Sequence, residues 1–365
     1  MPVSDMINDL STMVADLATL VEVESPSNDR DALNRSAEVL ASLMTERLGS
    51  APTLVDGPAG RHVHWSGGGS PKVLILGHHD TVFPLGSLAV RPFAVADGRA
   101  TGPGVFDMKA GIVQAIHAVA TLDDPSGVEI LMTCDEEVGA GTSKELLCER
   151  ALACGAVLVL EPSADGGVLK IGRKGVGTFE VVIAGRAAHA GLEPHKGVNS
   201  VLEAAHQLLA IAAIADPAAG TTVTPTVITG GTAENVVPAE TRISVDVRVS
   251  TMAEAERVEA CMAALSPVLD GASVAVHGRI SRPPLPETSS AELFPLAVAH
   301  DPSITGITVG GGSDGNFTAA LGVPTLDGLG AVGGGAHADS EHVIVDTMPD
   351  RARLLAAIIA ARCAP

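Results

Sequence analysis

Short apolar segments that end in acidic or histidine residues restrict most strongly how this chain can fold. The run at 73–77 ends in two histidines and an aspartate, and the run at 127–134 ends in three consecutive acids. A third run, 156–160, ends in one glutamate. Between them, the segment 107–122 has the apolar spacing of a helix. Strands that alternate with helices in this way predict an α/β fold with a mostly parallel central sheet.

Polar residues gather at the ends of these expected strands, where open α/β sheets bind their ligands. They are His78, Asp80, Asp107, Asp135, Glu136, Glu137, Glu161, His337, Asp339, Glu341 and His342. Each alone is typical of a solvated turn, but burying several carboxylates together without a cation would be very costly. Because Lys109 is almost the only basic residue nearby, a divalent metal is the better candidate. Histidine and carboxylate ligands without thiolate suit a catalytic zinc site, with cobalt or manganese as substitutes.

A site of this kind predicts hydrolytic chemistry. Two metals ~3.5–4 Å apart, bridged by one carboxylate, would polarise a carbonyl group and lower the pKa of a water molecule. A carboxylate beside that water would act as general base.

Residues 175–285 have a different pattern from the rest of the chain. Their expected elements follow the order β-α-β-β-α-β of a ferredoxin-like unit, and the proline-rich segment 279–286 closes it. We therefore expect a small domain at 175–285, inserted into a larger domain made of residues 1–174 and 286–365. The first helix of the chain and the two helices of the insert are expected at 4–22, 197–214 and 253–269.

Charge and composition exclude several classes of partner. The formal net charge is −20, which argues against binding to nucleic acid or to anionic membrane surfaces. No window of 18 apolar residues lacks charge, and the N-terminus has no basic segment followed by an apolar core. The number of cysteines, five, is odd, and no C-x-x-C pair occurs. We expect a cytoplasmic protein with free thiols and no membrane or nucleic-acid partner.

The motifs of the chain resemble those of a known family. They are GHHDTV, GPGVFDMKAG, DEEVG, LEPS, AAHAG, AENVVPAE, DVR, GGGSDGNF and GAHADSEHV. They occur in the order found in the M20 family of metallopeptidases and deacylases, and the chain looks like the branch with the bacterial glutamate carboxypeptidases. The resemblance covers residues 70–345, and it implies that the inserted domain is a lid that carries the contact of a homodimer.

The resemblance also implies a set of metal ligands. His78 and Glu161 would bind one zinc, Glu137 and His337 the other, and Asp107 would bridge both. The cofactors would be two Zn²⁺ per subunit, for which Co²⁺ or Mn²⁺ are possible substitutes. In this family the peptide bond after the bridging aspartate, here Asp107–Met108, is expected to be cis.

Expectations also follow for three residues close to these ligands in the sequence. Glu136 would be the general base and later the proton donor. Asp80 would orient His78 through the second nitrogen of its ring. His79, between them in the sequence, should point away by strand alternation.

The resemblance also implies roles for residues in and near the inserted domain. His189 would help to stabilise the oxyanion, in this family typically in the active site of the partner subunit. Arg248 would hold the free carboxylate of the substrate, with Asn235 and the backbone around Gly312 assisting. The alternatives are an ordinary ion pair for Arg248, a capping role for Asn235 and a solvated side chain for His189.

The function expected from these features is hydrolysis of an amide bond next to a C-terminal amino acid with a free carboxylate. The substrate would be a small peptide, and the released residue could be glutamate. The alternative is an N-acyl-amino-acid deacylase, similar to acetylornithine deacetylase or succinyl-diaminopimelate desuccinylase. A lesser alternative is a non-catalytic binding member of the fold, although all five ligands and Glu136 are present.

Overall fold

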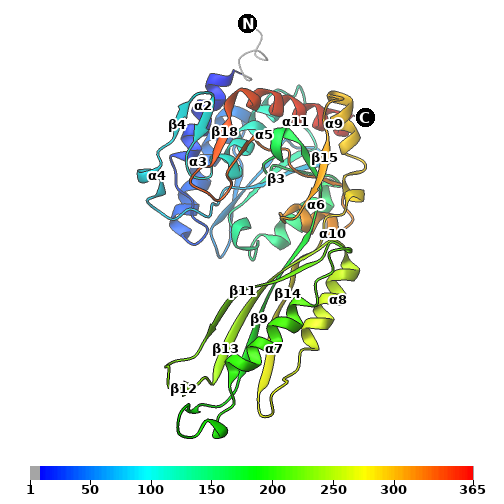
Figure 1. Cartoon of the computed structure of the whole chain (residues 1–365). Helices are drawn as coiled ribbons and strands as arrows, with labels where there is room; N and C mark the ends of the chain where they lie inside the picture. Colours follow the sequence, from blue (N-terminus) through cyan, green and yellow to red (C-terminus); the bar gives the residue numbers. More distant parts are fainter. Residues whose placement is uncertain (1–8, 365) are drawn as a thin grey trace. The chain divides into compact units, whose positions relative to one another are not determined.

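The computed structural model describes residues 9–364, which form two compact units (Figure 1). The first unit contains the described residues up to Gly172, together with Leu285–Val309 and the residues from Ser313 onward. The second unit contains Arg173–Pro284 and the short segment Gly310–Gly312. Within the described residues, no helix is both long enough and apolar enough to span a membrane.

A six-stranded sheet forms the centre of the first unit. In spatial order its strands are β1 (Thr53–Asp56), β2 (Arg61–Ser66), β6 (Val128–Thr133), β3 (Val73–His78), β7 (Val157–Val159) and β16 (Thr325–Leu326). The four strands from β6 to β16 run parallel, and β1 and β2 add an antiparallel edge. This arrangement confirms the expected α/β fold with a mostly parallel sheet.

Helices cover both faces of this sheet, which explains why its middle strands are apolar throughout. Val73 and Ile75 of β3 belong to the core beneath α2, α3, α5 and α11, whereas Leu74 and Leu76 face the core beneath α6 and α10. The helices are α2 (Leu10–Val21), α3 (Arg30–Leu48), α4 (Ser87–Val90), α5 (Ala110–Ala120), α6 (Lys144–Cys154), α9 (Phe294–His300), α10 (Gly315–Ala320) and α11 (Met348–Cys363). The helix expected at 4–22 corresponds to α2, and residues 4–8 lie outside the described residues.

Smaller sheets lie beside the central one. Four short strands pair in the order β17 (Gly333–Gly334), β18 (His342–Ile344), β5 (Arg99–Thr101) and β4 (Ala94–Ala96). Another pair joins β15 (Gly306–Val309) to β8 (Leu169–Arg173). Through β18 and β5, the C-terminal motif region and the segment before Asp107 are held together.

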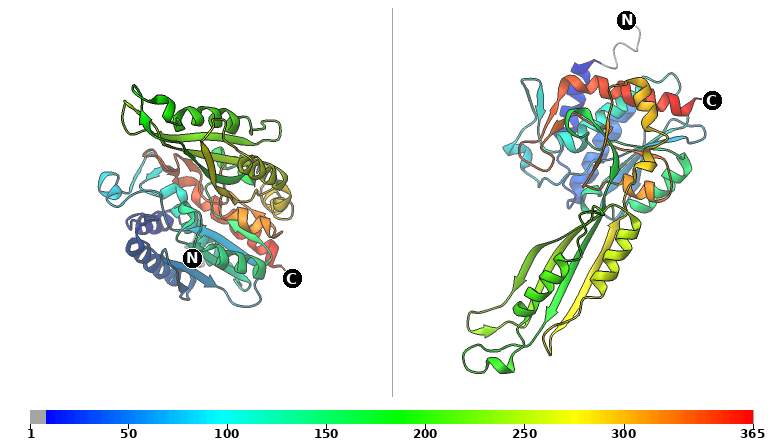
Figure 2. Two further views of the ribbon diagram at one scale, coloured as in Figure 1. Left: turned by 90° about the horizontal axis from the view of Figure 1, so that it is seen from below. Right: turned by 45° about the vertical axis from the view of Figure 1, so that its right-hand side comes forward.

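The second unit is a four-stranded antiparallel sheet with two helices on one face (Figures 1 and 2). The strands, in spatial order, are β11 (Thr222–Gly230), β13 (Glu240–Val249), β9 (Gly175–Ala184) and β14 (Ser273–Arg282). The helices are α7 (Ser200–Ala212) and α8 (Met252–Ala263), and a two-stranded pair joins β10 (Ala188–His189) to β12 (Val236–Val237). The chain order β9-α7-β11-β13-α8-β14 is the ferredoxin-like order expected from the sequence.

Candidate metal centre

His78, the last residue of β3, is oriented by hydrogen bonding. Its Nδ1 lies 3.0 Å from the main-chain oxygen of Asp80, so this nitrogen carries the proton and donates it. The other nitrogen, Nε2, lies 3.4 Å from Oδ1 of Asp107 and 3.6 Å from Oε1 of Glu161. The lone pair of Nε2 is therefore free to face a cation between these carboxylates.

Asp107 lies between two histidines. It belongs to the irregular turn η1 (Val105–Lys109), and a cis peptide bond joins it to Met108, as the resemblance implied. While Oδ1 faces His78, Oδ2 lies 3.4 Å from Nε2 of His337. Nε2 of His337 is also 3.2 Å from Oε2 of Glu137. The five side chains expected as metal ligands thus come together in the first unit, as two groups that share Asp107.

The donor atoms of this cluster fit a divalent metal. Oδ1 of Asp107 and Oε1 of Glu137 are buried and accept no hydrogen bond. Donor atoms of His78, Asp107 and Glu137 lie within 4.8 Å of one another, as do donor atoms of His78, Glu136 and Glu161. Buried carboxylate oxygens without partners are costly, and a cation in contact with them removes that cost.

The pKa values of the cluster reflect the same concentration of negative charge. Burial lowers the pKa of His78, but contacts with Asp107, Asp80 and Glu161 outweigh it and raise this pKa well above its ordinary value. Contacts with Asp107 and Glu137 raise the pKa of His337 to about 10. Both shifts show that the carboxylates favour a positive charge at this place, which a divalent cation would supply.

The carboxylate of Asp80 positions the turn that carries both glutamates. Its Oδ1 accepts a hydrogen bond from the backbone N–H of Glu136, and its Oδ2 accepts one from that of Glu137, each at 3.2 Å. Ser27 Oγ donates a further bond to Oδ2 at 2.7 Å. Oδ1 also lies 3.4 Å from Nδ1 of His78. Asp80 therefore contacts His78 with both its main chain and its side chain, and it holds the turn as well.

His79 points away from this cluster. Its Nε2 donates to the main-chain oxygen of Arg61 at 2.9 Å, and its Nδ1 lies 3.2 Å from the hydroxyl of Ser36. Burial lowers its pKa to about 4, so the ring is neutral. His79 is a packed core histidine.

Glu341 contacts the site, where the sequence grouped it with the other acids but gave it no specific role. Its fully buried carboxylate accepts three backbone N–H groups at 2.9 Å, those of Gly104, Phe106 and Asp107. Burial raises its pKa to about 7 in spite of these bonds. The only signal in the sequence was an acid four residues after His337, because its partners lie more than 230 residues earlier in the chain.

The remaining expected site residues belong to the second unit. Nδ1 of His189 accepts the backbone N–H groups of Gly191 and Leu192 at 3.1 Å, so its proton lies on Nε2. The main-chain oxygen of Asn235 accepts the N–H of Ala190 and so fixes the segment beside His189.

Arg248 and Gly312 already have partners within the second unit. Both Nε and Nη2 of Arg248 donate to the carboxylate of Asp246, at 3.0 and 2.9 Å. The main-chain oxygen of Gly312 accepts a bond from Arg173 at 3.3 Å.

Comparisons with known proteins agree with this architecture. Residues 171–269 match a family model described as a peptidase dimerisation domain. Carboxypeptidase G2 from Pseudomonas sp. (strain RS-16) is 30% identical over 378 residues, which cover 95% of this chain and 88% of that protein. A succinyl-diaminopimelate desuccinylase from Ectopseudomonas mendocina (strain ymp) is 29% identical, covering 92% of this chain and 96% of its own.

Solved structures share the fold over most of the chain. Aminopeptidase PepT from Bacillus cereus superposes with a TM-score of 0.77 at 21% identity, covering 98% of this chain and 99% of its own. The YXEP protein of Bacillus subtilis, described as a dinuclear metal binding peptidase from the M20 family, has a TM-score of 0.65 at 14% identity. This comparison covers 96% of this chain and 98% of that one.

Proposed function

Because this chain belongs to the M20 family of metallopeptidases, we propose that it is a zinc-dependent carboxypeptidase. It would cleave the amide bond before a C-terminal amino acid whose carboxylate is free, and glutamate is a candidate for that residue. The observation that carries the proposal is the position of Asp107, whose two oxygens face His78 and His337. This is the arrangement that a carboxylate between two metals requires.

Two cations would be held by the shared cluster. His78, Asp107 and Glu161 would hold one, and Asp107, Glu137 and His337 the other. Bound there, two Zn²⁺ ions would polarise the substrate carbonyl and make a water molecule more acidic.

Glu136 would move the proton in this reaction. It lies at the start of the turn after β6, and its carboxylate is within 4.8 Å of donor atoms of His78 and Glu161. From there it would take the proton of the attacking water and later give it to the leaving amine. Asp80 would hold Glu136 in place through its backbone N–H.

We assign substrate binding to the second unit, which would act as lid and dimerisation domain, while the first unit is the catalytic domain. The Nε2–H of His189 is available to donate to an oxyanion, because Nδ1 is occupied as an acceptor. Arg248 would bind the carboxylate of the substrate, assisted by Asn235 and the backbone at Gly312. Since Asp246 now occupies its guanidinium group, the substrate must share or replace that partner.

Exposed apolar side chains support a homodimer through this unit. Leu202 and Leu209 of α7 are 52% and 76% exposed, and Val227 and Ile228 of β11 are 56% and 50% exposed. β11 is an edge strand and packs beside α7, so apolar side chains of both elements are exposed near an open sheet edge. Such a surface is typical of a protein interface. The cytoplasmic location expected from the sequence stays a prediction.

A second candidate function is removal of an N-acyl group from an amino acid. The similarity to succinyl-diaminopimelate desuccinylases favours it, and the same cluster would serve the same chemistry. The test is a panel of amides assayed with the zinc-loaded protein, with glutamate-terminated, N-acetyl and N-succinyl substrates side by side. If kcat/KM is highest for a glutamate-terminated peptide-like amide, the result supports the carboxypeptidase proposal. Highest kcat/KM on an N-succinyl or N-acetyl amino acid selects the deacylase.

A further inference from the structure

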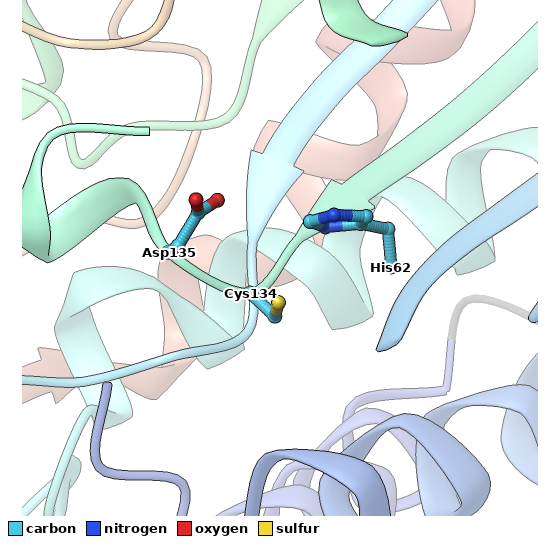
Figure 3. Close-up of side chains that lie close together, drawn as sticks. All are labelled: His62, Cys134 and Asp135. Carbon is cyan, nitrogen blue, oxygen red and sulfur yellow. The ribbon is translucent and has the colours of Figure 1, made fainter. Parts of the chain in front are cut away.

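A second cluster of metal-binding side chains lies outside the centre described above. It consists of His62, Cys134 and Asp135 (Figure 3). His62 belongs to β2, and the other two residues directly follow β6. The cluster forms because β2 and β6 are neighbours in the central sheet, with Val63 opposite Met132.

All three side chains are buried, and two of them have polar atoms without partners. His62 is 2% exposed, and neither nitrogen of its ring makes a hydrogen bond. Asp135 is 1% exposed, and its Oδ1 accepts none. Cys134 is fully buried, with a free thiol. Buried polar atoms are nearly always satisfied in folded proteins, so this concentration of unsatisfied ones needs a physical explanation.

The chemistry of the three donor groups supplies an explanation for these unsatisfied atoms. Burial lowers the pKa of His62, so its ring is neutral, which is the form that binds metals. One nitrogen, one sulfur and one carboxylate oxygen lie within 4.8 Å of one another. Ligand atoms around a tetrahedral zinc are ~3.5 Å apart, given bond lengths of ~2.0–2.3 Å. Small side-chain rotations would therefore close the three donors around an ion of this size.

We propose that His62, Cys134 and Asp135 form an additional metal site for a borderline-soft divalent cation such as Zn²⁺, distinct from the cluster around Asp107. Burial raises the pKa of the Cys134 thiol to about 12, so the thiol is protonated before binding. On binding, it loses its proton to solvent and a metal–sulfur bond forms. Asp135 is already fixed for this role, because its Oδ2 accepts bonds from Thr142 N at 2.6 Å and Thr142 Oγ at 2.8 Å. A cation here ties β2 to the turn that presents Glu136 and Glu137.

The thiolate ligand makes the site testable separately from the cluster around Asp107, where none of the assigned ligands contains sulfur. Protein freed of metal is titrated with Cd²⁺, and the ultraviolet charge-transfer absorption of cadmium–thiolate bonds is recorded. We expect an absorption that saturates at one thiolate-bound cadmium per chain. It should be absent in Cys134→Ser and require at least about tenfold more cadmium in His62→Gln.

Cys154→Ser is the matched control, because Cys154 is another buried free cysteine of the same unit. This variant should keep the full absorption of the wild type. An absorption that persists in Cys134→Ser would overturn the proposal, and so would its absence in wild-type protein whose cluster around Asp107 is saturated with cadmium.

Crystals of the wild-type protein, produced in zinc-supplemented medium, give a second measurement that needs no variant and no entry path into the folded chain. Anomalous diffraction on both sides of the zinc absorption edge should show a peak between His62, Cys134 and Asp135. Peaks confined to the cluster around Asp107 would reject the additional site and leave the proposed function intact.

Discussion

Glu341 holds Asp107 by its backbone: Oε1 of Glu341 accepts the N–H of Asp107 at 2.9 Å. The same oxygen accepts the N–H of Phe106, and Oε2 accepts that of Gly104. Asp107 is the residue whose carboxylate faces both histidines of the cluster. Glu341 is therefore a positioning residue, which acts on the metal centre through the turn that carries its shared ligand.

Glu341→Gln should weaken metal binding without removing a ligand. The amide replaces one acceptor oxygen by an NH₂ group, which opposes a backbone N–H instead of accepting from it. Loss of such a supporting contact typically costs about 10–100-fold in metal affinity. The measurement is zinc affinity by competition with a chromophoric chelator. Asp339→Asn, a change at an exposed neighbour, is the control and should leave affinity unchanged; equal affinities in all three proteins would contradict the role of Glu341.

Glu136→Gln should remove most turnover and leave the metal in place. A glutamine cannot accept the proton of the attacking water, and a general base typically contributes about 10²–10⁴-fold to the rate. Since Glu136 is not among the proposed ligands, zinc content by atomic absorption should match that of the wild type. Turnover within a factor of two of the wild type would exclude Glu136 as the base.

Much of this site could be predicted from the sequence, because the carboxyl ends of parallel strands meet at one edge of a sheet. His78 ends β3, and Glu137 and Glu161 follow β6 and β7. The contacts of Glu341 and of His62 could not be predicted, since they depend on pairing between segments far apart in the chain. No periodic pattern in the sequence indicates which of several acidic residues will accept a hydrogen bond from a backbone N–H group.

The helices show the same difference between features that depend on nearby residues and features that depend on packing with distant ones. The helix expected at 253–269 ends at Ala263, ahead of Pro267, which disfavours helical geometry at the residue before it. Pro267 is a local signal, which the sequence alone shows. By contrast, α6 (Lys144–Cys154) was not expected, because its charged residues interrupt any apolar stripe, and packing of Leu147 and Ala151 against the sheet stabilises it.

Asp16→Asn should destabilise the first unit. Arg47 donates two hydrogen bonds to the nearly buried carboxylate of Asp16, at 2.8 and 2.7 Å, and Nε2 of His117 lies 2.6 Å from it. Removing one charge of a buried pair typically costs about 3–5 kcal/mol, and since Arg47 is partly exposed we expect about 2–3 kcal/mol. Urea unfolding measures the change in free energy. The control Asp350→Asn breaks an exposed pair with Arg353 and should change stability by less than about 1 kcal/mol.

The contribution of Asp16 to the free energy of unfolding should also depend on pH. Burial acts to raise the pKa of Asp16, but the bonds from Arg47 and His117 outweigh it and hold this pKa below its ordinary value of 3.8. The folded protein therefore binds this proton less readily than the unfolded chain, and stability is lost as the pH falls through and below 3.8. The difference in unfolding free energy between wild type and Asp16→Asn should be constant from pH 6 to 5 and shrink towards pH 3. A difference that stays constant to pH 3 would show that the charge of Asp16 is not its source.

Ile228→Lys should disrupt the homodimer proposed for the second unit. Ile228 lies on the edge strand β11, where a lysine places a charge into an apolar interface and blocks pairing along the edge. Multi-angle light scattering should give the mass of two chains for the wild type and of one for the variant. Val90→Lys, at an exposed apolar residue of the first unit, should keep the dimer. A variant at Ile228 that retains the dimeric mass would place the interface elsewhere, and a monomeric wild type would remove the dimer from the proposal.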